Sequence, residues 1–323
     1  MSPAQATPLA VSAVLGVCVF LLLWLDRYRV EPLPWMAAVA AWGVAVPASL
    51  LAVGARVEAL VEAPAAGRPI PELWLTPAVL SVLLLCVGLA VPIGVVSRTT
   101  VLEGPSNGSV FGVVAGLSVF GGVQLLLAMR TAWRPTAAAL AFVCLLHAAV
   151  GAAFGAGVGL TRLAVRPAMR LPGGFAAAVA SGGIGALIVV GAVSSWRVWG
   201  EDGVACNLAL AGVAAVVLLS VFAVSFAYER RVLAGQLAEE VELGVLPAWA
   251  AEIVPNYARR IRSAWWRRRD ERREILRLLV TMAFRKHRLR ALPEDRARLY
   301  GLEVGRLRHR ARVVLAEHTE AGS

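Results

Sequence analysis

The residues best suited to chemistry in this sequence are a histidine and a cysteine inside one apolar run. His147 is the only histidine before residue 229, and Cys144 precedes it by three residues. In a helix this spacing places both side chains on one face. An ionisable side chain within a membrane span indicates a functional site, and a Cys–His pair is one way to build a nucleophile. The competing interpretation is structural, with a hydrogen-bonded imidazole and a small buried thiol.

The acidic residues of the apolar part lie elsewhere. Hydrolysis of an amide needs a general base or a metal-held hydroxide, and a zinc site takes at least three protein ligands. One histidine does not supply them, so the sequence predicts no metal and no cofactor. The eight acids before residue 229 all fall in expected loops or at span ends: Asp26, Glu31, Glu58, Glu62, Glu72, Glu103, Glu201 and Asp202.

Long apolar runs must position these residues. The chain of 323 residues is 59% hydrophobic, and runs of about 18 or more apolar residues are typical of transmembrane helices. We therefore predict an all-α polytopic membrane protein with about seven spans. The expected spans are Leu9–Leu25, Trp35–Ala55, Leu73–Val96, Ser109–Met129, Thr136–Leu160, Gly174–Trp196 and Val204–Ala227.

Charge divides the chain into two regions. Residues 1–228 carry 11 Arg and 8 acids, whereas residues 229–323 carry 21 basic and 13 acidic residues. We predict a transmembrane domain over 1–228 and a basic helical cytosolic domain over 229–323. The abundance of Ala, Val, Leu and Arg is typical of a high-GC bacterial coding sequence. The expected location is the bacterial cytoplasmic (inner) membrane, multi-pass, with the C-terminal domain in the cytosol.

The basic domain has the periodicity of helices. Pro247 suits a first helical turn and predicts a helix over Pro247–Trp266. Apolar residues then recur at helical spacing within Arg268–Arg290 and again after Leu292 and Pro293. The two stripes are expected to pack into a small bundle. They consist of Ile275, Leu278, Leu279 and Met282, and of Val304, Leu307, Ala311 and Val314.

Arginine and tryptophan mix at the start of this domain. Near a bilayer, basic residues contact anionic headgroups with about 1 kcal/mol each, so membrane lipid or a protein partner is expected. Interleaved acids also allow a solvated, self-paired face, and nucleic acid is not expected as a partner. The predicted surface comprises Arg259, Arg260, Trp265, Trp266, Arg267, Arg268 and Arg269.

Two apolar runs carry glycine at every fourth residue. Small residues at this spacing let transmembrane helices approach closely. His147 continues the second stripe one turn earlier, so chemistry is expected where the two faces meet. We predict a packing seam that also provides a groove for other helices. The stripes are Gly108, Gly112 and Gly116, and Gly151, Gly155 and Gly159.

Several stretches resemble the PrsW family of bacterial intramembrane proteases, which are related to the CAAX-protease superfamily. Residues 26–32, Asp-Arg-Tyr-Arg-Val-Glu-Pro, are similar to the family's Asp-Arg-Tyr-x-x-Glu-Pro. Residues 103–112, Glu-Gly-Pro-Ser-Asn-Gly-Ser-Val-Phe-Gly, are similar to its Asp-Gly-Pro-x-Asp-Gly-x-Val-Tyr-Gly. Residues 147–159 resemble its His-Ala helix with spaced glycines, and the tail at 242–247 looks like that of high-GC members. The resemblance covers most of 20–165 and, more loosely, 229–315.

The resemblance implies a catalytic set of a Glu-Glu pair, a Glu-Asn pair and histidines that hold a metal or activate water. At the matching positions this chain has Val95 and Val96 for the first pair, and Thr99 for a following lysine. Val123 and Gln124 replace the second pair. His147 is the only retained position of this set.

The chain thus has the family's loop and glycine pattern but lacks its catalytic acids. This combination predicts a pseudoprotease, a non-catalytic relative that binds transmembrane helices of partner or client proteins. The alternative is an active PrsW-type protease with a rearranged site. It would cleave membrane-anchored regulators such as anti-sigma factors, take an acid such as Glu103 from a loop, and bind zinc. A transporter is disfavoured because the spans contain no buried acids for a coupling ion.

Overall fold

The computed structural model describes residues 33–62, 75–99, 102, 104–130, 137–163, 203–256, 259, 269–290, 292 and 294–320. Within these ranges the regular elements are helices and no strand occurs, which confirms the all-α fold class. The helices are α2 (Leu33–Glu62), α3 (Leu75–Arg98), α4 (Pro105–Arg130), α5 (Ala137–Leu163), α7 (Val204–Glu242), α8 (Ala248–Ile253), α10 (Arg269–Leu289) and α11 (Glu294–Glu320).

Three of the described helices are long and apolar enough to cross a membrane, so the chain is a membrane protein. They are Pro105–Gln124 in α4, Ala137–Thr161 in α5, and α7. Shorter apolar stretches, Pro34–Pro47 and Val87–Arg98, lie in α2 and α3. The predicted spans Leu9–Leu25 and Gly174–Trp196 lie outside the described residues, so the total of seven stays a prediction.

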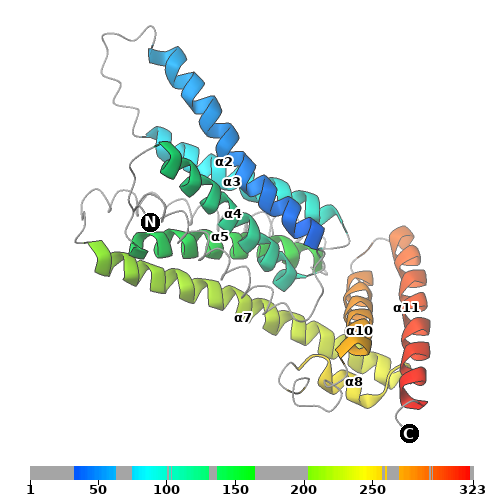
Figure 1. The fold of residues 1–323 in the computed structure, drawn as a ribbon. Helices are drawn as coiled ribbons and strands as arrows, with labels where there is room; N and C mark the ends of the chain where they lie inside the picture. Colours follow the sequence, from blue (N-terminus) through cyan, green and yellow to red (C-terminus); the bar gives the residue numbers. More distant parts are fainter. Residues whose placement is uncertain are drawn as a thin grey trace.

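Helix α4 lies at the centre of the membrane-embedded helices (Figure 1), in contact with α2, α3, α5 and α7. Of its apolar span, 89% is buried inside the protein, against 22% for α7. Phe111 and Phe120 of α4 and Phe142 of α5 are among the most deeply buried side chains. A helix that is apolar on all sides is buried in this way because every face has a neighbour.

Helix α7 connects the membrane part to the C-terminal helices without a break (Figure 1). Its 39 residues correspond to a length of about 58 Å. Phe222 belongs to the apolar core of the membrane part, whereas Val232 and Leu237 belong to a second core shared with α8, α10 and α11. The change from one core to the other occurs around Tyr228, where the apolar sequence of α7 ends.

A glycine ends α7. Gly244 has φ +66°, the left-handed conformation that glycine adopts without strain. The Val245 N–H donates to the Glu240 carbonyl at 2.9 Å and the Gly244 N–H donates to the Val241 carbonyl at 2.9 Å. This pair of bonds is the Schellman motif. The segment at 242–247 is therefore a helix end that leads the chain from α7 into α8.

The tail stripes predicted from the sequence are confirmed as the inner faces of a helical bundle. Leu279, Met282 and Ala311 are fully buried, and the other stripe residues belong to or pack against the same core. The uninterrupted helix predicted over Pro247–Trp266 is wrong, because α8 ends at Ile253. Pro255 follows the C-cap residue Val254, and its ring nitrogen has no N–H with which to continue the helix.

Candidate functional site

The glycine stripes of α4 and α5 pack directly against each other. The helices are antiparallel, so that Gly108 faces Gly155 and Gly112 faces Gly151. A Cβ atom added at any of these four glycines would lie closer than 3.0 Å to a carbonyl oxygen of the opposite helix. Gly159 continues this contact at one end by facing the carbonyl of Gly104.

This register places His147 at the other end of the seam. A Cβ atom at Gly116 would contact the backbone carbonyl of His147, so His147 takes the position of the next residue in the α5 stripe. The two backbones fill the space between the stripes. The groove that we expected between these faces is therefore a closed seam, and a further helix has to bind elsewhere.

The His147 side chain is held within its own helix. Its Nδ1 lies 2.8 Å from the Val143 carbonyl oxygen, which only accepts, so Nδ1 is the donor. The ring packs beside Phe120 of α4 with 5.7 Å between ring centroids. Cys144 is buried one turn earlier. Among the described residues no group of three His, Cys, Asp or Glu side chains is placed to hold a metal ion.

The positions that match the catalytic motifs of the PrsW family differ in how far they are buried. Val95 is 50% exposed on α3, whereas its neighbour Val96 is buried in the membrane core. The Thr99 hydroxyl donates to the Val96 carbonyl at 2.7 Å at the end of α3. Val123 and Gln124 are half-buried on α4. Only some of these positions therefore face the interior of the protein.

A buried acid, Glu229, lies at the N-terminus of α4. One oxygen of its carboxylate accepts a hydrogen bond from the Ser106 N–H at 3.0 Å, and the other accepts one from the Ser106 hydroxyl at 2.5 Å. Only 8% of Glu229 is exposed. Ser109 lies one turn further along α4, with its hydroxyl 3.5 Å from that of Ser225 on α7. A carboxylate here accepts from the Ser106 N–H at the start of α4 and complements the positive end of the helix dipole.

Sequence reasoning missed this contact because it ended the last span at Ala227 and considered only acids before residue 229. A signal was present. Ser225 and Glu229 are four residues apart and share one helix face, as Ser106 and Ser109 do three residues apart. Two polar pairs at the ends of neighbouring apolar helices indicate a shared polar contact.

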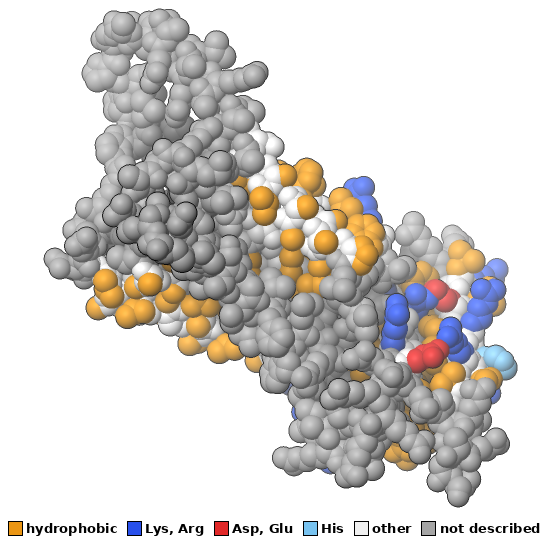
Figure 2. Space-filling view, in the orientation of Figure 1, with side chains coloured by type: hydrophobic (Ala, Val, Ile, Leu, Met, Phe, Trp, Pro, Cys, Tyr) orange, Lys and Arg blue, Asp and Glu red, His pale blue; other side chains and the backbone are white. Residues whose placement is uncertain are grey.

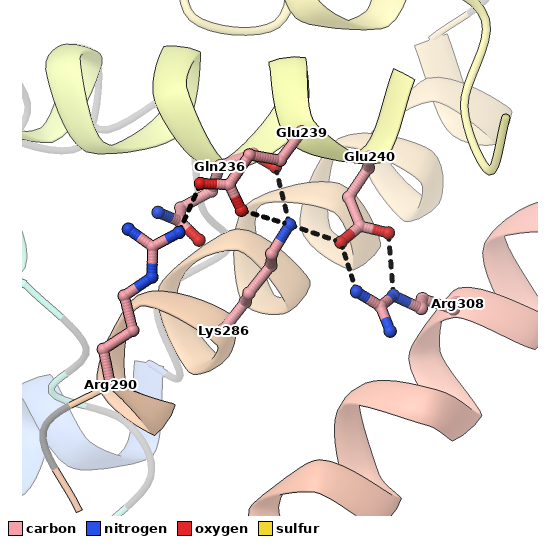
Figure 3. Close-up of polar contacts among 6 residues, drawn as sticks. All are labelled: Gln236, Glu239, Glu240, Lys286, Arg290 and Arg308. Carbon is pink, nitrogen blue, oxygen red and sulfur yellow. Dashed lines mark hydrogen bonds and ion pairs between the residues drawn. The ribbon is translucent and has the colours of Figure 1, made fainter. Parts of the chain in front are cut away.

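A second polar cluster joins α7 to the tail helices (Figure 3). Glu240, whose side chain is 1% exposed, accepts from Arg308 Nε at 2.7 Å and from Arg308 Nη2 at 2.6 Å. Lys286, the only lysine of the chain, lies 2.6 Å from Glu240 and 2.8 Å from Glu239. Arg290 also pairs with Glu239.

The cations of this cluster stabilise both carboxylates. Burial by itself would raise the pKa of Glu240, but the hydrogen bonds from Arg308 and Lys286 outweigh this and lower the pKa below its ordinary value. The hydrogen bonds from Lys286 and Arg290 lower the pKa of Glu239 as well. The Glu240 carboxylate in turn raises the pKa of Arg308. Both carboxylates are thus ionised at neutral pH.

The predicted membrane-surface residues are described only in part. Arg259 is exposed and pairs with Glu252 at 3.3 Å, so it belongs to a solvated pair. Arg269 begins α10. Arg260, Trp265, Trp266, Arg267 and Arg268 lie outside the described residues.

The helices and their two polar clusters define a class: an all-α membrane protein whose last membrane helix extends into a helical tail. Comparison with known proteins gives no matching family model, no similar curated protein and no similar solved structure. The resemblance to the PrsW family therefore depends on the sequence motifs alone.

Proposed function

We propose that this chain is a non-catalytic, PrsW-like membrane protein that binds the transmembrane helix of a partner or client protein. Its expected place is the bacterial inner membrane, with the tail in the cytosol. The observation that carries the proposal is the uncovered face of α7. Only 22% of the apolar span of α7 is buried (Figures 1 and 2), so most of this helix is available to lipid or to another helix.

The uncovered face of α7 has mostly small residues along its centre and larger residues at its edges. We call this set the α7 face. Close approach of helices in a membrane depends on small residues in this arrangement. At 100° per residue the small residues form one strip, which the exposed Val216 interrupts between Gly212 and Ser220, and valine and leucine side chains flank it on both sides. The small residues are Ala205, Ala209, Gly212, Ser220, Ala223 and Ala227, all exposed, and the flanking residues are Leu208, Val213, Val217, Leu219 and Val224.

This face replaces the α4–α5 seam as the proposed binding surface. A Cβ atom at Gly212 would meet nothing within 4 Å, in contrast to one at Gly112. The same type of small-residue strip is thus closed by a neighbour in α4 and open in α7. Since His147 is bonded within its own helix, the proposal assigns it to packing and not to hydrolysis. Regulation of a membrane-anchored signalling protein fits such a helix-binding role.

The test uses purified full-length protein and a panel of single-span reporter proteins. Cys206 is exposed on α7 and allows disulfide cross-linking to a reporter that carries one cysteine. Ala223→Leu should reduce reporter capture about tenfold by filling the strip. Ala41→Leu is the matched control, because Ala41 is an exposed alanine of α2, and it should leave capture unchanged. Equal effects of both changes, or cross-linking that does not require Cys206, would contradict the proposal.

The same purified protein and reporters also test the alternative that the chain is an active protease. Zinc content and reporter cleavage are measured for the wild type and for His147→Ala. Stoichiometric zinc together with cleavage that His147→Ala abolishes would replace the non-catalytic proposal by a protease with a rearranged site. Intact reporters that remain bound to both forms support the helix-binding function.

A further inference from the structure

The outward side of α11 carries a stripe of residues with the spacing of a coiled-coil seam. Positions at i, i+3, i+7, i+10 and i+14 follow one line on a helix that pairs with another helix. We call this set the α11 stripe. All five of its residues are exposed, and Leu299 and Leu302 are 69% and 66% exposed. The five residues of the α11 stripe are Leu299, Leu302, Arg306, His309 and Val313.

The α11 stripe is opposite to the side that α11 uses within the tail. Val304 and Ala311 face the tail core, and Arg308 reaches Glu240 on α7. Arg288 of α10 lies over the ring of Tyr300 at 5.6 Å from its centroid. The inner side of α11 is therefore engaged by three separate contacts, and the exposed leucines have no role in the tail core.

Charge decides which partner fits. Arg306 occupies the middle of the α11 stripe and is exposed. In a parallel pair of identical stripes Arg306 would lie opposite Arg306, and in an antiparallel pair it would lie opposite Leu302 or His309, so no pairing of two identical stripes places an acid opposite Arg306. Like charges at a helix seam disfavour pairing. A second copy of this chain is therefore a poor partner, and a helix with an acid opposite Arg306 is a good one.

The position of α11 argues against a lipid surface as the occupant. Helix α10 contacts both α5 and α11, and it lies between α11 and the membrane helices (Figure 1). The α11 stripe thus points away from the bilayer that surrounds α5. A flat membrane would contact the side of the tail that faces α5 and would not contact the α11 stripe. The described part of the tail surface in Figure 2 shows hydrophobic side chains beside Lys or Arg and Asp or Glu side chains.

From these observations we propose that the α11 stripe binds an amphipathic, acidic helix of a partner protein outside the membrane. Leucines of the stripe would pack against apolar residues of the partner, and Arg306 would pair with a carboxylate. This site is independent of the helix-binding α7 face, so either can fail without the other.

The experiment uses the full chain in detergent and two synthetic helices of about three heptads. One carries leucines on its seam with Glu opposite Arg306, and the other carries Lys in place of Glu. Fluorescence anisotropy should show binding of the acidic peptide only, and Arg306→Glu should weaken it about tenfold or more while it restores binding of the basic peptide. Leu302→Gln should weaken binding of either peptide.

Arg312→Glu is the matched control, because Arg312 is exposed on α11 away from the stripe. It makes the same change in charge and should alter the affinity less than about threefold. Equal weakening by Arg306→Glu and Arg312→Glu would mean non-specific charge attraction and would overturn the proposal. Self-association that Leu302→Gln abolishes, or binding to anionic vesicles that Arg306→Glu and Leu302→Gln abolish without any peptide binding, would overturn it as well.

Discussion

Glu229 of α7 accepts two hydrogen bonds from Ser106, the second residue of α4, across 123 positions of sequence. This contact places the first charged residue of α7, directly after its apolar sequence, on the first turn of α4, the most deeply buried of the three described apolar spans. Gly104 permits it, because a Cβ atom there would collide with the Glu229 carboxylate. The α4 N-terminus and the tail are thereby connected through one rigid helix.

Glu229→Ala should destabilise the membrane part by about 1–2 kcal/mol. The change removes a capping carboxylate and leaves the buried Ser106 N–H without that acceptor. Glu229→Gln should cost less because an amide oxygen still accepts. The measurement is thermal or denaturant unfolding of the purified protein in detergent. Glu242→Ala, at an exposed position of the same helix, is the control and should change little. Equal losses would show that the cap contributes nothing.

Gly112→Ala should destabilise the α4–α5 pair by about 1–3 kcal/mol through overpacking. The added methyl group would collide with the Gly151 carbonyl, and backbone atoms on both sides of the seam leave little room for adjustment. Gly94→Ala is the matched control, since a Cβ atom at Gly94 meets nothing within 4 Å. It should be neutral or stabilising by up to about 1 kcal/mol because alanine favours helix. Unfolding in detergent compares the two, and a tolerated Gly112→Ala would refute the close approach.

Local patterns predicted much of this fold. The helical spacing of Ile275, Leu278, Leu279 and Met282 identified a buried face that the structure confirms. Such periodicity is a property of neighbouring residues, so it can be read without knowing what packs against them. The four-residue spacing of the glycines is equally local. It indicates a close-packed face, and the structure shows that the partner of each glycine face is the other one.

Contacts between distant residues could not be predicted in this way. Glu229 with Ser106 and Arg308 with Glu240 are separated by 123 and 68 positions. Each partner alone resembles an ordinary charged or polar residue of a helix. The identity of the pair depends on how far α7 continues beyond the membrane, and the charges that follow Ala227 suggested a domain boundary at that point. The helix continues because the second core buries Leu233 and Leu237.

Glu240→Gln should destabilise the tail by about 3 kcal/mol. It removes the buried charge that pairs with both Lys286 and Arg308, and leaves two cations close together without it. Glu239→Gln should cost less than about 1 kcal/mol, since Glu239 is 38% exposed and solvent screens its pairs. Limited proteolysis of the tail in the two variants gives the comparison. Equal protection of both variants would contradict the central role of Glu240.

The tail should also lose stability in acid. The folded-state pKa values of Glu239 and Glu240 are lowered by their cationic partners, so the unfolded tail binds protons more readily than the folded one. Their contribution is complete above the ordinary glutamate pKa of about 4.3 and decreases as the pH falls through the lower, folded-state values. Protease sensitivity of the tail, measured with an acid-active protease between about pH 6 and pH 3, should therefore rise at the acid end. Glu240→Gln removes one of the two titrating groups and should make this dependence shallower, because its neutral side chain binds no proton in either state. A variant with an unchanged pH profile would show that other carboxylates control the acid sensitivity.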